Sequence, residues 1–191
     1  MLTRPGSSRG ASMIEVLVAI VIVIIGLLGL AGLQARSGVT EVESFQRAQA
    51  VELLQDMVDR IQANPLNSMA YVTAAPLGTG TPAQDCSALT GAALDLCEWN
   101  NSLLGASESN AGLSVGAMIG ARGCVDNVSP TMPRVFLVSV VWQGTYKTKS
   151  PGSTCGQGLY GPSGMRRGIT ATVVIGCLQN NPATGLCAFP P

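Results

Sequence analysis

An unbroken apolar run from Val16 to Leu33 constrains this chain more than any other feature of its sequence. At about 1.5 Å per helical residue the run reaches roughly 27 Å, close to the hydrocarbon thickness of a bilayer. One carboxylate, that of Glu15, lies directly before the run. Because an ionisable group at membrane depth is costly and by default serves a specific interaction, we expect Glu15 to have a partner.

The residues before the apolar run form a short polar leader, 1–10, with Arg4 and Arg9 and no acid. This charge pattern favours retention of the leader in the cytoplasm while the apolar run enters the membrane. An ordinary secretory signal, removed after a small-x-small site such as Gly29-Leu30-Ala31, is the alternative. The run is longer than a usual signal core and helical patterning continues past it, so the sequence favours a retained anchor.

Glu15 also fits the end of a helix capping box, Ser12-Met13-Ile14-Glu15. In this interpretation Ser12 accepts from the backbone N–H of Glu15, whose carboxylate reaches back to the N–H of Ser12 and complements the positive helix end. The cap and a partner in an assembly are compatible, because the first belongs to the isolated subunit and the second to packed subunits.

Helical patterning continues beyond the apolar run and becomes amphipathic. Acidic and basic residues lie largely between apolar residues spaced mostly three and four apart, namely Val42, Phe45, Val51, Leu54, Val58 and Ile61. The helix should stop near Asn64-Pro65, since the residue before proline disfavours helix. We therefore expect one helix over 11–64, with a transmembrane part over about 11–35 and a part over about 36–64 that docks on a domain.

Three glycines, Gly26, Gly29 and Gly32, lie within the apolar run. Each costs about 1 kcal/mol relative to alanine in a helix, so this segment is where the helix should most easily open. Small residues also let helix backbones approach closely within a membrane.

The remaining residues, 65–191, predict an α+β domain. A loop is expected over 76–82 and a second helix over 89–104. Valine-rich or β-branched segments predict strands over 134–142 and 169–175, with a weaker candidate over 113–119. Three or four antiparallel strands packed against a helix would give a domain large enough for one core.

Charge excludes one large class of function. The chain has 11 basic and 11 acidic residues, and removal of Arg4 and Arg9 leaves nine against 11, a net charge of −2. No basic excess points to nucleic acid. After Asn110, however, Asp126 is the only acid beside six basic residues. This surface is either a solvated face or a docking site for an acidic helix of a neighbouring subunit.

Six cysteines accompany a complete lack of histidine, and no two cysteines have C-x-x-C spacing. Zinc is therefore disfavoured, and disulfides formed in an oxidising compartment such as a periplasm are favoured. Several pairings are possible, and we prefer the sequential one: Cys86 with Cys97, Cys124 with Cys155, and Cys177 with Cys187.

The sequence does not predict an enzyme or a cofactor. Without histidine the usual general base is missing, and neither a Gly-x-Ser-x-Gly elbow nor a phosphate-binding loop is present. Residues 156–161 satisfy G-x-G-x-x-G, but they follow a turn-rich stretch rather than a strand. We interpret these residues as loop glycines.

The leader, Gly10, the carboxylate of Glu15 five positions later and the apolar run together resemble the N-terminus of a type IV prepilin or pseudopilin. The resemblance implies cleavage by a prepilin peptidase between Gly10 and Ala11, followed by N-methylation of Ala11. The family usually has phenylalanine at the first mature position, so Ala11 departs from its pattern. The resemblance also implies an intersubunit ion pair between Glu15 and the mature α-amino group of a neighbour.

Short segments of the remaining chain resemble the PilV-like pilus modification group of minor pilins. They are Asp95 to Trp99, Arg122 to Cys124 entering a strand, Val138 to Trp142, and Arg166-Arg167. The implied fold is that of type IV pilins, a long membrane-spanning helix packed against a small antiparallel sheet, with leader 1–10, helix 11–64 and a disulfide-bonded periplasmic domain 65–191.

This resemblance implies a minor pilin, held as a single-pass inner-membrane protein before assembly and located in the pilus, at its tip, afterwards. Its partners would be other minor pilins and the major pilin, in a hetero-oligomeric filament or tip complex that supports twitching motility and adhesion. A minor pseudopilin of a type II secretion system and a membrane-anchored periplasmic binding domain or enzyme are the alternatives.

Overall fold

The computed structural model describes residues 12–106, 109–110, 113–114, 118–129, 131, 133–162, 164–176, 179–180 and 187–188. The chain divides into two compact units, Met1–Val42 and Glu43–Pro191. One helix, α1 (Met13–Ala63), contributes to both units. It ends directly before the predicted stop at Asn64-Pro65.

In the first unit, α1 is long and apolar enough to cross a membrane, by length and composition. The apolar side chains from Val16 to Leu33 are exposed; Ile25, for example, retains 65% of its accessible surface. Among the described residues of this unit, none packs against them to form a core. The apolar surface of such a helix must be shielded from water, either by lipid or by other protein.

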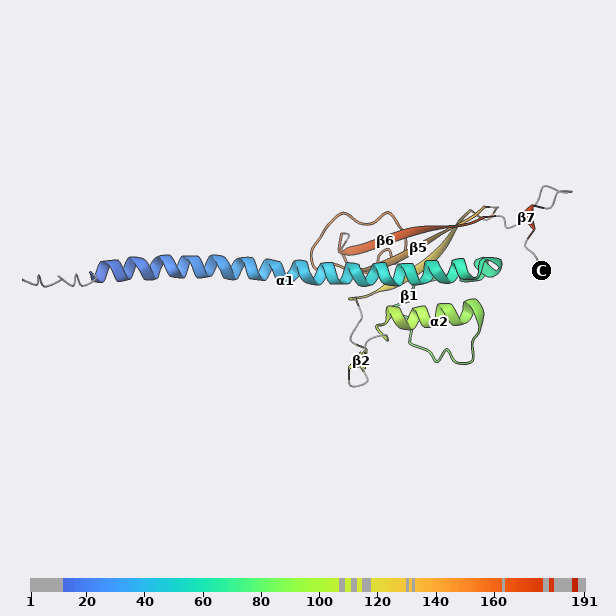
Figure 1. Ribbon diagram of the computed structural model, residues 1–191, viewed down its shortest axis with the longest axis horizontal. Helices are drawn as coiled ribbons and strands as arrows, with labels where there is room; N and C mark the ends of the chain where they lie inside the picture. Colours follow the sequence, from blue (N-terminus) through green and yellow to red (C-terminus); the bar gives the residue numbers. More distant parts are fainter. Residues whose placement is uncertain are drawn as a thin grey trace, which may run out of the picture. The chain divides into compact units, whose positions relative to one another are not determined.

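The second unit contains a four-stranded antiparallel sheet with the order β1-β4-β5-β6 (Figure 1). Its strands are β1 (Leu77–Gly78), β4 (Arg122–Ser129), β5 (Arg134–Gln143) and β6 (Arg166–Ile175). The pairing of β5 with β6 is unbroken from Arg134↔Ile175 to Gln143↔Arg166, whereas β4 shifts register between Asn127 and Ser129.

Two helices and two hairpins complete this unit. The 3-10 helix η1 (Pro65–Tyr71) follows α1, and α2 (Gly91–Leu103) follows β1. The strands β2 (Ser109–Asn110) and β3 (Leu113–Ser114) pair with each other, as do β7 (Gln179–Asn180) and β8 (Cys187–Ala188).

The core of the second unit lies between the helices and one face of the sheet. Its α1 residues follow a spacing of three and four, which places them on one helix face: Ala50, Leu54, Met57, Val58 and Ile61. From α2, Trp99 is fully buried and donates from Nε1 to the carbonyl of Leu53 at 2.9 Å. The sheet supplies mainly valine and other β-branched residues, together with the fully buried Phe136.

Close packing of α2 on the sheet requires glycine at position 123. A Cβ atom at Gly123 would lie 2.2 Å from Cη2 of Trp99, far inside van der Waals contact. The indole ring therefore lies directly on the backbone of β4.

The predicted α+β class, with a long N-terminal helix and an antiparallel sheet, is confirmed. Several local predictions need correction. The 76–82 loop contains β1, and η1 was not predicted. Of the predicted strand over 113–119, only β3 is a described strand, and it pairs with β2 outside the main sheet. In the amphipathic part, Leu54, Val58 and Ile61 are buried, but Phe45 and Val51 are exposed.

Candidate functional site

Glu15 lies in the first turn of α1, exposed, immediately before the apolar run. Neither side-chain bond of the predicted capping box is formed by Ser12 or Glu15 in the part of the chain that is described. Instead, the backbone carbonyl of Ser12 accepts from the N–H groups of Glu15 at 2.9 Å and Val16 at 3.3 Å. The carboxylate of Glu15 is thus not engaged by its own helix and is available to a partner.

The three glycines of the apolar run, Gly26, Gly29 and Gly32, lie within continuous α1. A Cβ atom at any of them would meet nothing within 4 Å. In the single chain the helix is continuous at these positions. Because glycine has no side chain, each of them leaves a shallow notch in the helix surface. Helix opening stays a prediction.

Two of the predicted disulfides are present, Cys86–Cys97 and Cys124–Cys155. The first joins the segment before α2 to the middle of that helix. The second joins β4 to the loop between β5 and β6. In the chain-entropy model, each disulfide that closes a loop of this length stabilises the domain by roughly 3 kcal/mol. Gly10, Ala11 and Cys177 lie outside the described residues, as does the side chain of Cys187.

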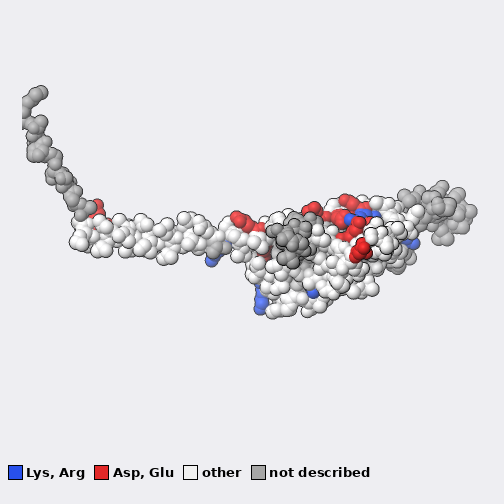
Figure 2. Space-filling view, turned by 90° about the horizontal axis from the view of Figure 1, so that it is seen from below, with Lys and Arg blue, Asp and Glu red and all other residues white. Residues whose placement is uncertain are grey.

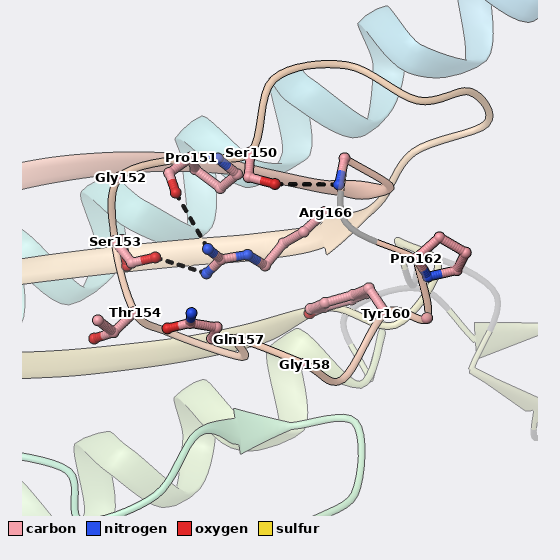
Figure 3. Close-up of a pocket in the computed structure, with 12 residues that line it drawn as sticks. Ser150, Pro151, Gly152, Ser153, Thr154, Gln157, Gly158, Tyr160, Pro162 and Arg166 are labelled. Carbon is pink, nitrogen blue, oxygen red and sulfur yellow. Dashed lines mark hydrogen bonds between the residues drawn. The ribbon is translucent and has the colours of Figure 1, made fainter.

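The loop between β5 and β6 is organised by Arg166, which is 8% exposed (Figure 3). Its guanidinium donates to the carbonyls of Ser153 at 2.7 Å, Pro151 at 3.2 Å and Cys155. No carboxylate pairs with Arg166 among the described residues, so the buried charge is stabilised by carbonyl dipoles. Arg166 thereby holds this loop against the outer face of the sheet.

A cavity of about 390 Å³ lies beneath this loop, lined by Arg166 and by hydroxyl, amide and glycine groups. Tyr160 closes one side (Figure 3), with its hydroxyl 2.7 Å from the carbonyl of Gly120, and burial raises its pKa. Gly156, Gly158 and Gly161 have positive φ values, as tight turns require. The G-x-G-x-x-G sequence is therefore part of a turn-rich loop and does not join a strand to a helix.

A second polar group joins α1, η1 and α2. Arg60 binds Asp56 at 2.9 Å, Asp95 at 2.9 Å and Glu98 at 2.7 Å. Tyr71 donates its hydroxyl to Asp95 as well. Burial by itself lowers the pKa of Arg60, but the bonds to its three carboxylates raise it overall.

Three carboxylates around one guanidinium leave this junction negative. Figure 2 shows acidic side chains gathered on one face of the second unit. Among the described residues, no group of histidine, cysteine or acidic side chains has the arrangement of a metal site.

Glu43 links α1 to the loop after β5 and to the start of β6. Its Oε1 accepts from Nη2 of Arg167 at 3.2 Å, and from the backbone N–H and the hydroxyl of Thr145 at 3.0 and 2.7 Å. The Arg167 guanidinium also lies 5.0 Å from the centre of the Tyr146 ring.

Neither the group around Arg60 nor the pair of Glu43 with Arg167 was predicted from the sequence. Asp56 and Arg60 have the i, i+4 spacing of a helix ion pair, which was a usable signal. Nothing local connects Glu43 with Arg167, because the pair depends on how β6 returns to the helix.

One comparison with known proteins gives a match. Residues 32–100 match the family described as Tt1218-like, type IV pilin Tt1218. The matched segment runs from α1 through η1 and β1 into α2. Neither the curated proteins nor the solved structures include a match to this chain.

Proposed function

We propose that this chain acts as a minor pilin, because its long N-terminal helix, its antiparallel sheet and the match over residues 32–100 support a type IV pilin role in pilus assembly. In this proposal it joins other minor pilins and the major pilin in a hetero-oligomeric complex at the filament tip. That complex primes or caps the pilus and supports twitching motility and adhesion.

The observation that carries the proposal is the carboxylate of Glu15, which no described side chain binds, at the start of an exposed apolar helix. A pure anchor gains nothing from an acid at this depth. Removal of the leader 1–10 by a prepilin peptidase would create an α-amino group at Ala11, the site of N-methylation. In a packed filament, Glu15 of one subunit would pair with that group on a neighbour.

Burial makes the loss of either partner of this ion pair energetically costly. Removing one partner of a buried ion pair costs about 3–5 kcal/mol, because the remaining charge is left without compensation. Lipid does not drive apolar helices together, so close approach at Gly26, Gly29 and Gly32 would supply packing energy. Glu15 would then set the register between neighbouring helices.

Exposed apolar side chains of α1 in the second unit offer a further contact surface. Phe45 is 58% exposed and Val51 is 51% exposed, outside the stripe of α1 residues that packs into the core. Large exposed apolar side chains on a helix are suited to contact with another helix. We assign these two positions to contacts between subunits.

The location follows from the same features. The basic leader would remain in the cytoplasm, residues 11–35 would cross the inner membrane, and 36–64 with the domain 65–191 would lie in the periplasm. The disulfides Cys86–Cys97 and Cys124–Cys155 suit that oxidising compartment. After assembly the protein would be located in the pilus.

The identity of co-isolated subunits tests this proposal against its nearest alternative. The tagged full-length protein should be purified from crosslinked membranes and from sheared pili, with an untagged strain as the control. The proposal predicts major and minor pilins beside the tagged chain. Recovery with type II secretion components instead would identify a pseudopilin, and a chain found alone in the membrane would favour an anchored binding domain.

A further inference from the structure

Strand β6 is the last strand of the main sheet, and β5 is its only neighbour among the described strands. The backbone groups that it turns toward β5 can be identified from one hydrogen bond. Gly144 donates to the carbonyl of Met165 at 2.7 Å, and these two residues continue the register in which Gln143 lies opposite Arg166. In an antiparallel ladder such directly opposed, hydrogen-bonded pairs occur at every second position.

The odd-numbered residues of β6, from Arg167 to Ile175, therefore bond to β5. The even-numbered residues turn their N–H and C=O groups away from the sheet: Arg166, Gly168, Thr170, Thr172 and Val174. No backbone bond from these outward groups is formed with any described residue. The result is a row of unpaired donors and acceptors along one side of the domain.

No other described strand of this chain covers that row. The short strands β2 and β3 pair with each other, and β7 pairs with β8. At the opposite side of the sheet, β1 pairs with the start of β4, and Thr73 exchanges two further bonds with Val125. Within the described part of the chain, the sheet thus has one protected edge and one free edge.

The free edge lacks the devices that normally prevent strand pairing. From Gly168 to Ile175 it contains no proline, lysine or acid, and its pairing with β5 has no bulge. Arg166 and the loop at Pro151 cover the outer face only at the start of the strand, where a Cβ at Gly168 would lie 3.2 Å from Cγ of Pro151. Among the described residues nothing covers the outer face from Thr170 to Val174, where Thr170, Thr172 and Val174 are exposed.

We propose that this edge, centred on Thr172, binds an extended segment of another pilin subunit by β-strand addition. The proposal rests on the assembly role proposed above and names the surface through which a different subunit is bound. A second copy of this chain is a poorer occupant, because its described sheet offers only the same β6 edge. Pairing of two β6 edges would close a dimer and would not extend an assembly.

The two faces of β6 define the chemistry of the bound segment. Ile169 and Ala171 pack on the rim of the core, whereas Thr170 and Thr172 are exposed on the other face. An added strand would continue both faces, with apolar residues beside Ile169 and Ala171 and small or polar residues beside the threonines. Main-chain bonds would supply affinity and the apolar positions would supply specificity.

A proline scan in the full-length protein tests this edge. Thr172→Pro removes an outward N–H, while Thr172→Val keeps it and serves as the matched control. Ala171→Pro removes an N–H that bonds to β5 and should unfold the sheet. We expect Thr172→Pro to retain its membrane level and its unfolding temperature within a few degrees of the parent. Its recovery in sheared pili should fall about tenfold or more, since a main-chain bond is lost and the ring blocks pairing.

Equal recovery of Thr172→Pro and the parent would overturn the proposal. If Thr172→Pro does not fold, p-benzoylphenylalanine at position 172 gives the answer, because irradiated pili should contain a covalent adduct of this chain with another pilin. Absence of that adduct in pili that contain the substituted chain would overturn strand addition alone. Absence of the parent from pili would contradict the minor-pilin assignment itself.

Discussion

Glu43 and Arg167 lie 124 residues apart in sequence, yet Oε1 of Glu43 is 3.2 Å from Nη2 of Arg167. The same oxygen accepts two bonds from Thr145, so one carboxylate joins α1 to both ends of the loop between β5 and β6. This contact fixes the sheet to the helix at the boundary where the second unit begins.

Replacing Glu43 with glutamine should destabilise the second unit. The variant keeps the shape of the side chain but leaves Arg167 without its carboxylate, and we expect a loss of about 1 kcal/mol at pH 7, allowing for solvent at this site. Thermal unfolding of the full-length protein measures it. Glu41→Gln is the control, since Glu41 is exposed and accepts only a 3.4 Å bond from Ser37. Equal losses in both variants would contradict a role specific to Glu43.

The contribution of Glu43 should depend on pH in a defined direction. Partial burial raises the pKa of Glu43, but the bonds from Thr145 and the charge of Arg167 lower it overall, below its ordinary value of 4.5. A depressed pKa stabilises the folded state above the unfolded-state pKa, and this stability is lost as the pH falls through the folded-state pKa. The difference between the parent and Glu43→Gln should therefore be constant near neutrality and shrink below about pH 4.5.

Gly123→Ala should be much more disruptive than its single added methyl group suggests. The new Cβ would lie 2.2 Å from the Trp99 ring, which is itself held by the 2.9 Å bond to Leu53. Helix α2 must move or the sheet must bend, at a cost of about 3 kcal/mol. Denaturant unfolding should separate this variant from Gly152→Ala, whose Cβ meets nothing within 4 Å. A Gly123→Ala protein as stable as the control would mean that α2 is not packed this tightly.

Local sequence patterns predicted the elements of this fold better than their pairing. The end of α1 follows from Pro65, and the strands at β5 and β6 follow from β-branched composition. β4 was harder to predict, because Gly123, Asp126 and Asn127 dilute its strand signal. Its place in the sheet depends on Trp99 packing over Gly123, a contact between distant segments.

The candidate sites divide in the same way. Glu15 and the glycines of the apolar run are recognisable because their meaning depends on neighbours in sequence. Arg166 is adjacent to Arg167, yet one binds loop carbonyls and the other binds Glu43, because alternate residues of a strand face opposite sides of the sheet. That difference depends on register, which composition does not specify.

Cleavage of the leader is a separate prediction of the proposed maturation. Mass spectrometry of the full-length gene product should find a mature N-terminus at Ala11. Gly10→Val should block the cut, because glycine lets a protease approach the backbone closely, whereas Gly6→Val in the same leader should be processed normally. A mature protein that begins at Gly32 or beyond would make the apolar run a removable signal.

The recovery of Glu15→Val in sheared pili tests the central claim most directly. Removing the carboxylate should leave membrane retention and leader cleavage intact, while the neighbour's buried amino group loses its partner. A penalty of about 3–5 kcal/mol corresponds to at least a hundredfold fall in an assembly equilibrium, and Glu41→Val provides the matched control. We predict that Glu15→Val remains in the membrane and is almost absent from pili. Its recovery at the level of the parent protein would contradict the ion-pair mechanism of assembly.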